Sequence, residues 1–147
     1  MSDPFALADA DEVAAVLNWL AEHPKVTEAL GGPGRVSGVR EAPWPRLRVA
    51  AGPSGDLADL TWRTEPEVSL ELYGDPGGWP GPAALGRMLK VCAIAAAQLP
   101  DAPPVPGRSV ISRVRPSGVL IESPLETGQP RWVMGLLITQ RPNPENV

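Results

Sequence analysis

The sequence predicts an α+β domain, in which a single layer of mostly antiparallel sheet is packed by a long central helix and an N-terminal helix. Three observations support this fold class. Two segments carry apolar residues at helical spacing, several segments alternate apolar and polar residues, and strand-like segments follow one another after each helix. The 147 residues fit one domain, 1–147, in which we expect 1–7 and 143–147 to be flexible.

The N-terminal helix is predicted to begin at Asp9 or Asp11, either of which can cap it, and to run to about Glu22. Four apolar residues at the i, i+3, i+4, i+7 spacing form its buried stripe. They are Val13, Val16, Leu17 and Leu20. Pro24 interrupts the pattern, and one more short turn is expected before the glycine-rich stop at 31–34.

Two strands are predicted between the helices. Residues 46–49 alternate charged and apolar side chains, as in a strand that is solvated on one side, and a glycine-rich loop over 52–55 follows. Residues 67–73 alternate most cleanly, with the apolar side chains of Val68, Leu70 and Leu72 on one side. The acidic residues here are interpreted as an exposed strand face rather than as metal ligands: Glu65, Glu67 and Glu71.

The central helix is predicted over residues 82–99, where a broad apolar stripe faces the sheet. Pro82 suits a first helical turn, and the prolines from Pro100 onward prevent continuation. Burial of roughly six large side chains at about 1.5 to 3 kcal/mol each would dominate the stability of the fold. Cys92, the single cysteine, lies in this stripe and is interpreted as an inert buried thiol in a reducing compartment.

Three more strands are predicted at 109–115, 119–123 and 131–141. The short connection at 116–118 is expected to form a hairpin, and 124–130 a longer loop. In the last strand Trp132, Met134, Leu136 and Ile138 share one apolar side. The other side mixes Val133 and Leu137 with arginines, which favours a face that is only partly covered and can meet a neighbour.

Composition argues against several functional classes. The net charge is −4 without a basic run, so direct nucleic-acid recognition is not expected. No segment approaches the roughly 20 apolar residues of a membrane span, and we expect neither a secretory signal nor a membrane partner. Residues 1–34 hold six acids and one base, whereas the remainder holds eleven acids and twelve bases. This asymmetry could orient two faces of an assembly.

No residue pattern points to catalysis. His23 and Cys92 are the only histidine and the only cysteine, so neither a histidine-based triad nor a structural zinc site can be built. The glycines of 31–38 and of 74–82 lack the features of a phosphate-binding loop, and prolines in the second segment remove backbone donors. We therefore predict no catalytic residue, no cofactor, no metal site and no enzymatic activity.

Five tryptophans stand against one phenylalanine and one tyrosine. Trp44 and Trp79 lie in proline-rich loops and Trp62 lies near a strand, whereas Trp132 is expected in the core and Trp19 at a helix border. Tryptophan and arginine are enriched at the energetic centres of interfaces. The loop tryptophans are therefore candidate interface residues, or else they cover the edges of a modest core.

In these elements and their order, the chain resembles the tail terminator proteins of long-tailed bacteriophages, which are head-to-tail connector or neck proteins. The resemblance covers nearly the whole length and rests on six segments, taken from the sequence in order. They are the first helix ending in His23-Pro24 with the Gly31-Gly32 stop, the Pro43-Trp44-Pro45 to Val49 strand with its glycine-rich loop, Glu67 to Gly74-Asp75, the long helix to Leu99-Pro100, Val114-Arg115-Pro116-Ser117-Gly118, and Thr127-Gly128-Gln129-Pro130-Arg131. It implies a small subunit that forms a ring, typically a hexamer, which caps the finished tail tube and offers the head a docking face.

The resemblance also implies the partners and the location. The partners are further copies of the chain, the tail tube protein and a head–tail stopper or connector protein. The protein would act at the tail–neck junction of a virion assembled in the host cytoplasm. We expect the contacts to use seven residues: Trp44, Trp62, Trp79, Arg113, Arg115, Arg131 and Arg141.

Rival functions remain open. The chain could be another neck or tail protein, such as a stopper, an adaptor or a tube subunit. A different class is a small ligand-binding or enzymatic α+β domain that uses the loop at 74–82, with Asp75 and Arg87 as its polar groups. A nucleic-acid adaptor would show salt-sensitive DNA binding.

Overall fold

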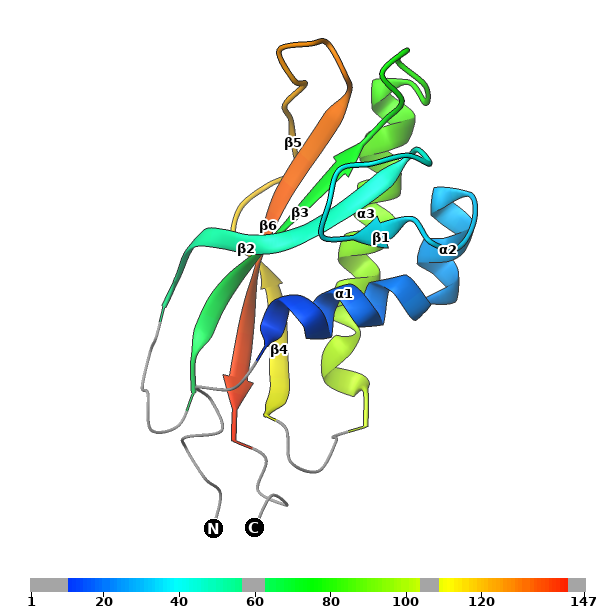
Figure 1. The fold of residues 1–147 in the computed structure, drawn as a ribbon. Helices are drawn as coiled ribbons and strands as arrows, with labels where there is room; N and C mark the ends of the chain where they lie inside the picture. Colours follow the sequence, from blue (N-terminus) through cyan, green and yellow to red (C-terminus); the bar gives the residue numbers. More distant parts are fainter. Residues whose placement is uncertain (1–10, 57–62, 104–108, 143–147) are drawn as a thin grey trace.

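The computed structural model describes residues 11–56, 63–103 and 109–142, so the ends expected to be flexible lie outside the described residues. The elements in chain order are α1 (Glu12–Glu22), α2 (Pro24–Leu30), β1 (Val36–Ser37), β2 (Arg46–Asp56), β3 (Glu65–Tyr73), α3 (Pro82–Ala97), the 3₁₀ helix η2 (Leu99–Asp101), β4 (Val110–Pro116), β5 (Ile121–Glu122) and β6 (Arg131–Arg141). Figure 1 shows the α-helices gathered on one side of the sheet. The predicted α+β class is confirmed.

The helix ends follow from local chemistry. Asp11 caps α1, because its carboxylate accepts a hydrogen bond of 2.9 Å from the Ala14 N–H. His23 ends α1 and also caps α2, since its Nδ1 accepts a hydrogen bond of 3.2 Å from the Lys25 N–H. Pro24 therefore begins α2 instead of only interrupting α1. Gly31 ends α2 in the left-handed conformation, with φ 85°.

The sheet has the strand order β1-β2-β3-β6-β4, and β5 also pairs with β6. Only β1 and β2 pair in parallel among the described strands, so the predicted antiparallel character is confirmed. Side chains that alternate along these strands place one apolar row against the helices. The core residues of the strands are Leu47, Val49, Val68, Leu70, Leu72, Met134, Leu136 and Ile138.

The prediction of a loop at 52–55 was wrong, because β2 continues through these residues to Asp56. A β-bulge between Ala51 and Gly55 takes up the extra residues without ending the pairing with β3. Gly55 adopts a φ of 123°, and a Cβ there would lie 2.7 Å from the backbone nitrogen of Glu67. Glycine thus allows the close approach of two backbones.

The hairpin expected between the strands at 109–115 and 119–123 was also wrong. Both β4 and β5 pair with β6, in one line, through Pro116↔Leu136 and Ile121↔Val133. The turn between them bends the chain but does not reverse it, because the Ser117 N–H donates to the Gly135 carbonyl at 3.0 Å and holds the segment along β6. The hairpin is instead formed by β5 and β6 (Figure 1).

Helix α3 supplies the largest helical part of the core, as predicted, with buried residues Leu85, Gly86, Leu89, Cys92, Ala95 and Ala96. Burial raises the pKa of the Cys92 thiol to about 12, so the expectation of an inert buried thiol is consistent with its surroundings. Trp132 packs against α3, where a Cβ on Gly86 would lie 3.0 Å from the indole ring. Its Nε1 donates to the Pro82 carbonyl at 2.9 Å.

Candidate functional site

The face of the sheet opposite the helices, which we call the polar face, carries the candidate interface residues of the strands. No described helix packs on it. Cross-strand pairing places Arg46, Tyr73 and Arg131 in one row. A second row of this face, on β3, β6 and β4, contains Glu67, Leu137 and Arg115. In each row one uncharged residue, Tyr73 or Leu137, lies between two charged residues.

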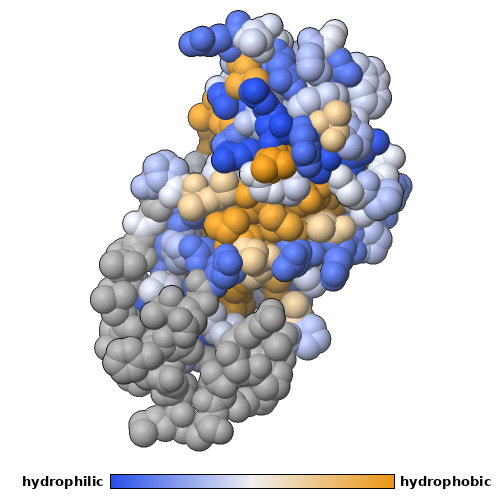
Figure 2. Space-filling model, in the orientation of Figure 1, coloured by the Kyte–Doolittle hydropathy of each residue, from blue (hydrophilic) through white to orange (hydrophobic). Residues whose placement is uncertain are grey.

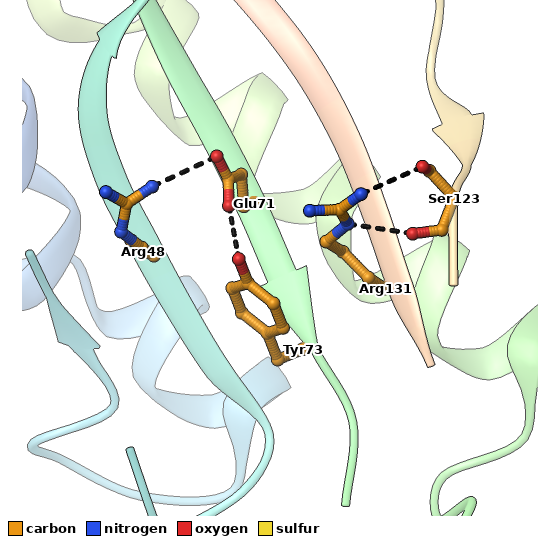
Figure 3. A network of polar contacts seen from close by, with 5 residues as sticks. All are labelled: Arg48, Glu71, Tyr73, Ser123 and Arg131. Atoms are coloured by element: carbon orange, nitrogen blue, oxygen red, sulfur yellow. Dashed lines mark hydrogen bonds and ion pairs between the residues drawn. The ribbon is translucent and has the colours of Figure 1, made fainter. Parts of the chain in front are cut away.

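Two groups of polar contacts lie next to each other on this face (Figure 3). Arg48 Nη1 lies 3.1 Å from Glu71 Oε1, and the Tyr73 hydroxyl donates to the other oxygen of Glu71. Arg131 binds Ser123 twice, with Nε donating to its carbonyl at 2.7 Å and Nη2 to its hydroxyl at 3.0 Å. These contacts join β2 to β3, and β6 to the segment after β5.

Burial raises the pKa of the Tyr73 hydroxyl above its ordinary value, and the hydrogen bond to the Glu71 carboxylate raises it further. Arg131 acts in the opposite direction. The Arg40 guanidinium lies 5.8 Å from the centre of the Tyr73 ring. The tyrosine is thus held neutral among three charged groups, in a structural network.

A further group of contacts surrounds Glu67. Its Oε2 accepts a hydrogen bond of 2.5 Å from the Ser117 hydroxyl. Gly52 and Gly135 leave room for the carboxylate, because a Cβ on either residue would overlap its oxygens. Next to it, Glu65 accepts a hydrogen bond of 3.2 Å from the Thr139 hydroxyl.

The interpretation of the three glutamates as an exposed face was therefore wrong. Glu67 is buried, and Glu65 and Glu71 are half-buried in ion pairs with Arg115 at 3.7 Å and Arg48. Arg46 also departs from the expectation of a solvated side, since it is buried and its Nε donates to the Glu41 carbonyl at 2.9 Å. Neighbouring strands supply the partners, which a single strand pattern does not reveal.

The four candidate arginines all belong to the polar face, but they do not form one cluster. Arg113, Arg115 and Arg141 lie toward the C-terminal end of β6. Arg131 lies at the other end, roughly 25 Å away along the strand. Arg113 and Arg141 are exposed and make no ion pair or side-chain hydrogen bond within 11–56, 63–103 and 109–142. They are the arginines most available to a partner.

The tryptophans divide between surface and packing roles. Trp79 is 63% exposed in the loop before α3 and remains a candidate contact residue. Trp44 is half-buried, and its carbonyl accepts a hydrogen bond of 2.6 Å from Arg35, whereas Trp62 lies outside the described residues. Trp132 packs against the core as predicted. Trp19 lies at the helix border, where its Nε1 donates to the Ala95 carbonyl at 2.7 Å.

Sequence reasoning missed a pocket of about 500 Å³ where α1, α2 and η2 meet. Its lining includes Trp19, Glu22, His23, Gln98 and Asp101. His23 Nε2 and Gln98 Oε1 are 2.7 Å apart, and the His23 ring lies edge-to-face with Trp19. Since 75 residues separate His23 from Gln98, no local pattern could have revealed this site.

Apolar side chains also gather on the surface. Figure 2 shows an apolar band across the middle of the molecule, in the region of α1 and β2, with polar side chains above and below it. Among the apolar residues of α1 and β1, Val13, Leu17 and Val36 are half-buried and pack against the core. An apolar centre with a polar rim is typical of protein–protein interfaces.

The rival ligand site in the loop at 74–82 gains no support. The Asp75 carboxylate accepts a hydrogen bond of 2.6 Å from the Gly77 N–H and so stabilises the turn, and Arg87 is exposed on α3. Within the described ranges there is no group of three or more metal-ligating side chains, and no helix is long and apolar enough to cross a bilayer.

No protein-family model matches this chain, and no curated protein is significantly similar to it in sequence.

Proposed function

We propose that this protein is a structural subunit of a phage tail that assembles into a ring on the tail tube. The ring ends tube polymerisation and provides a docking face for the head. The proposal begins from the resemblance to tail terminator proteins, which follows the order of elements along the chain. It implies a hexamer, with the tail tube protein on one side and a stopper or connector protein on the other.

The observation that carries the proposal is the presence of two chemically different surfaces on opposite layers of the fold. The polar face presents Arg113 and Arg141, exposed and unpaired within the described part of the chain. The helix layer presents the carboxylates of Glu22 and Asp101, which are also exposed. A closed ring uses head-to-tail contacts, which need two different, complementary patches on each subunit.

The charged groups elsewhere on the polar face support this assignment in another way. The contacts of Glu65, Glu67, Glu71 and Arg131 are made within the subunit and stabilise the sheet. Among the four candidate arginines, Arg113 and Arg141 are the two without a partner inside the described part of the subunit. Charge reversal of Arg131 should therefore disturb the β5–β6 hairpin, and Arg113 is the better position for testing a contact.

Tube growth in the presence of the protein tests the function. Purified tail tube protein is allowed to polymerise, the protein is added at substoichiometric amounts, and tube lengths are measured by electron microscopy. The proposal predicts that lengths stop increasing and that a ring is visible at one tube end. A rival tube subunit would instead polymerise along the axis, and continued growth with uncapped ends would contradict the proposal.

A further inference from the structure

The pocket between α1, α2 and η2 has the chemistry of a receptor for a positively charged side chain. Glu22 and Asp101 are exposed carboxylates in its lining, and neither makes an ion pair within the residues that the structure describes. Trp19 and His23 supply aromatic surface. A planar guanidinium can meet both features, because it pairs with carboxylates and lies over aromatic rings.

The volume and the internal contacts of the pocket fit a side chain better than a large ligand. Its volume of about 500 Å³ lies in the lower half of the range of small-molecule sites. His23 Nε2 and Gln98 Oε1 lie at a hydrogen-bond distance of 2.7 Å, so these two side chains satisfy each other and hold one side of the pocket in place. The two carboxylates therefore supply the free charge at the site.

The same chain carries the matching groups on its other layer. Arg113 and Arg141 belong to the polar face of β4 and β6, whereas the pocket belongs to the helix layer. Within one copy the two surfaces belong to opposite faces of the sheet, since η2 packs on the helix side of β4 and the Arg113 side chain belongs to its other side. Two copies arranged head to tail can bring them together, and each copy then keeps one free surface for the next.

We propose that the pocket formed by Trp19, Glu22, His23 and Asp101 receives the exposed arginines, Arg113 and Arg141, of a second copy of this chain. This inference rests on the proposed ring function and assigns its subunit contact. The contact is heterologous, so repetition closes a ring when the rotation between copies allows it.

Self-association of the full chain is measured by sedimentation velocity at low ionic strength, up to millimolar concentration, because contacts between charges weaken as salt is added. Two double variants each reverse one surface. One carries Arg113→Glu and Arg141→Glu, and the other carries Glu22→Lys and Asp101→Lys. The matched control is Arg87→Glu, which reverses an exposed arginine of α3 outside both surfaces. Circular dichroism verifies that every variant is folded.

We expect the unaltered chain and the control to associate, and each double variant to associate at least about tenfold more weakly. An equimolar mixture of the two double variants should regain association, because the reversed arginine surface then meets the reversed pocket and the native arginines meet the native pocket. Unchanged association in either double variant, no recovery in the mixture, or an unaltered chain that stays monomeric throughout would overturn the inference. Tube capping is measured separately. If the protein caps tubes but does not show the predicted self-association, the assigned subunit contact is wrong and the proposed function stands.

Discussion

The Ser117 hydroxyl and the Glu67 carboxylate are joined by a hydrogen bond of 2.5 Å, although fifty residues separate them in the chain. The bond lies over Gly135 of β6, where a Cβ would overlap Ser117 Oγ. It attaches the bend between β4 and β5 to β3, the central strand. The hydrogen bond therefore requires glycine at position 135.

Gly135→Ala should lower the free energy of unfolding by about 1 to 3 kcal/mol, because the new methyl group displaces both partners of a half-buried hydrogen bond. Urea unfolding measures the change. Gly118→Ala is the matched control, since a Cβ at Gly118 meets nothing within 4 Å. Equal stability of the two variants would show that the Glu67 contact contributes little.

Tyr73 should ionise above its ordinary pKa of about 10 in the folded protein. It is the only tyrosine in the chain, so the ultraviolet absorbance of tyrosinate reports on this residue alone. Glu71→Gln should lower the midpoint, because it removes the negative charge that favours the neutral hydroxyl. A midpoint at the ordinary value in the unaltered protein would contradict the buried network.

The same shift has a consequence for stability. Since the pKa of Tyr73 is raised in the folded state, the unfolded chain loses its proton first as the pH rises. The contribution of Tyr73 is fully present below about pH 10 and is lost as the pH rises from there through the folded pKa. Tyr73→Phe should remove this part of the pH dependence, which unfolding curves measured across alkaline pH can detect.

Cys92 should react with thiol reagents only when the chain opens. With a pKa of about 12, its thiolate fraction at neutral pH is about a thousandfold below that of an ordinary cysteine, and the side chain is buried as well. Alkylation followed by mass spectrometry should show slow labelling of the folded protein and rapid labelling in denaturant. Rapid labelling under native conditions would mean that α3 separates readily from the sheet.

Asp11→Ala should destabilise the protein by about 1 kcal/mol, because the Ala14 N–H loses its side-chain acceptor at the start of α1. Asn18→Ala, at an exposed position within the same helix, is the control. Thermal unfolding should separate the two variants. A similar loss of stability in both variants would contradict a specific contribution of the Asp11 cap.

The elements that could be predicted are those whose signal lies within one segment. The alternation along residues 131–141 placed Met134 and Leu136 on the buried side and the arginines on the other, and the pairing confirms this. The apolar stripe of α3 was equally local. Such periodicity depends only on which residues face the core.

What could not be predicted depends on partners far away in the chain. The prolines and glycines around Ser117 indicate a bend, but they do not say that β5 continues along β6 instead of folding back on β4. The partners of Glu67 and His23 come from segments fifty and 75 residues away. The polar network and the pocket therefore became visible only in three dimensions.

The central claim is that the protein binds tube ends, and the amount bound per tube tests it most directly. Tubes of two different mean lengths are prepared from the tail tube protein, saturated with the labelled chain and sedimented, and the bound label is divided by the number of tubes. The account predicts the same small number of subunits per tube at both lengths. Binding that increases in proportion to tube length, or no binding to either preparation, would contradict it.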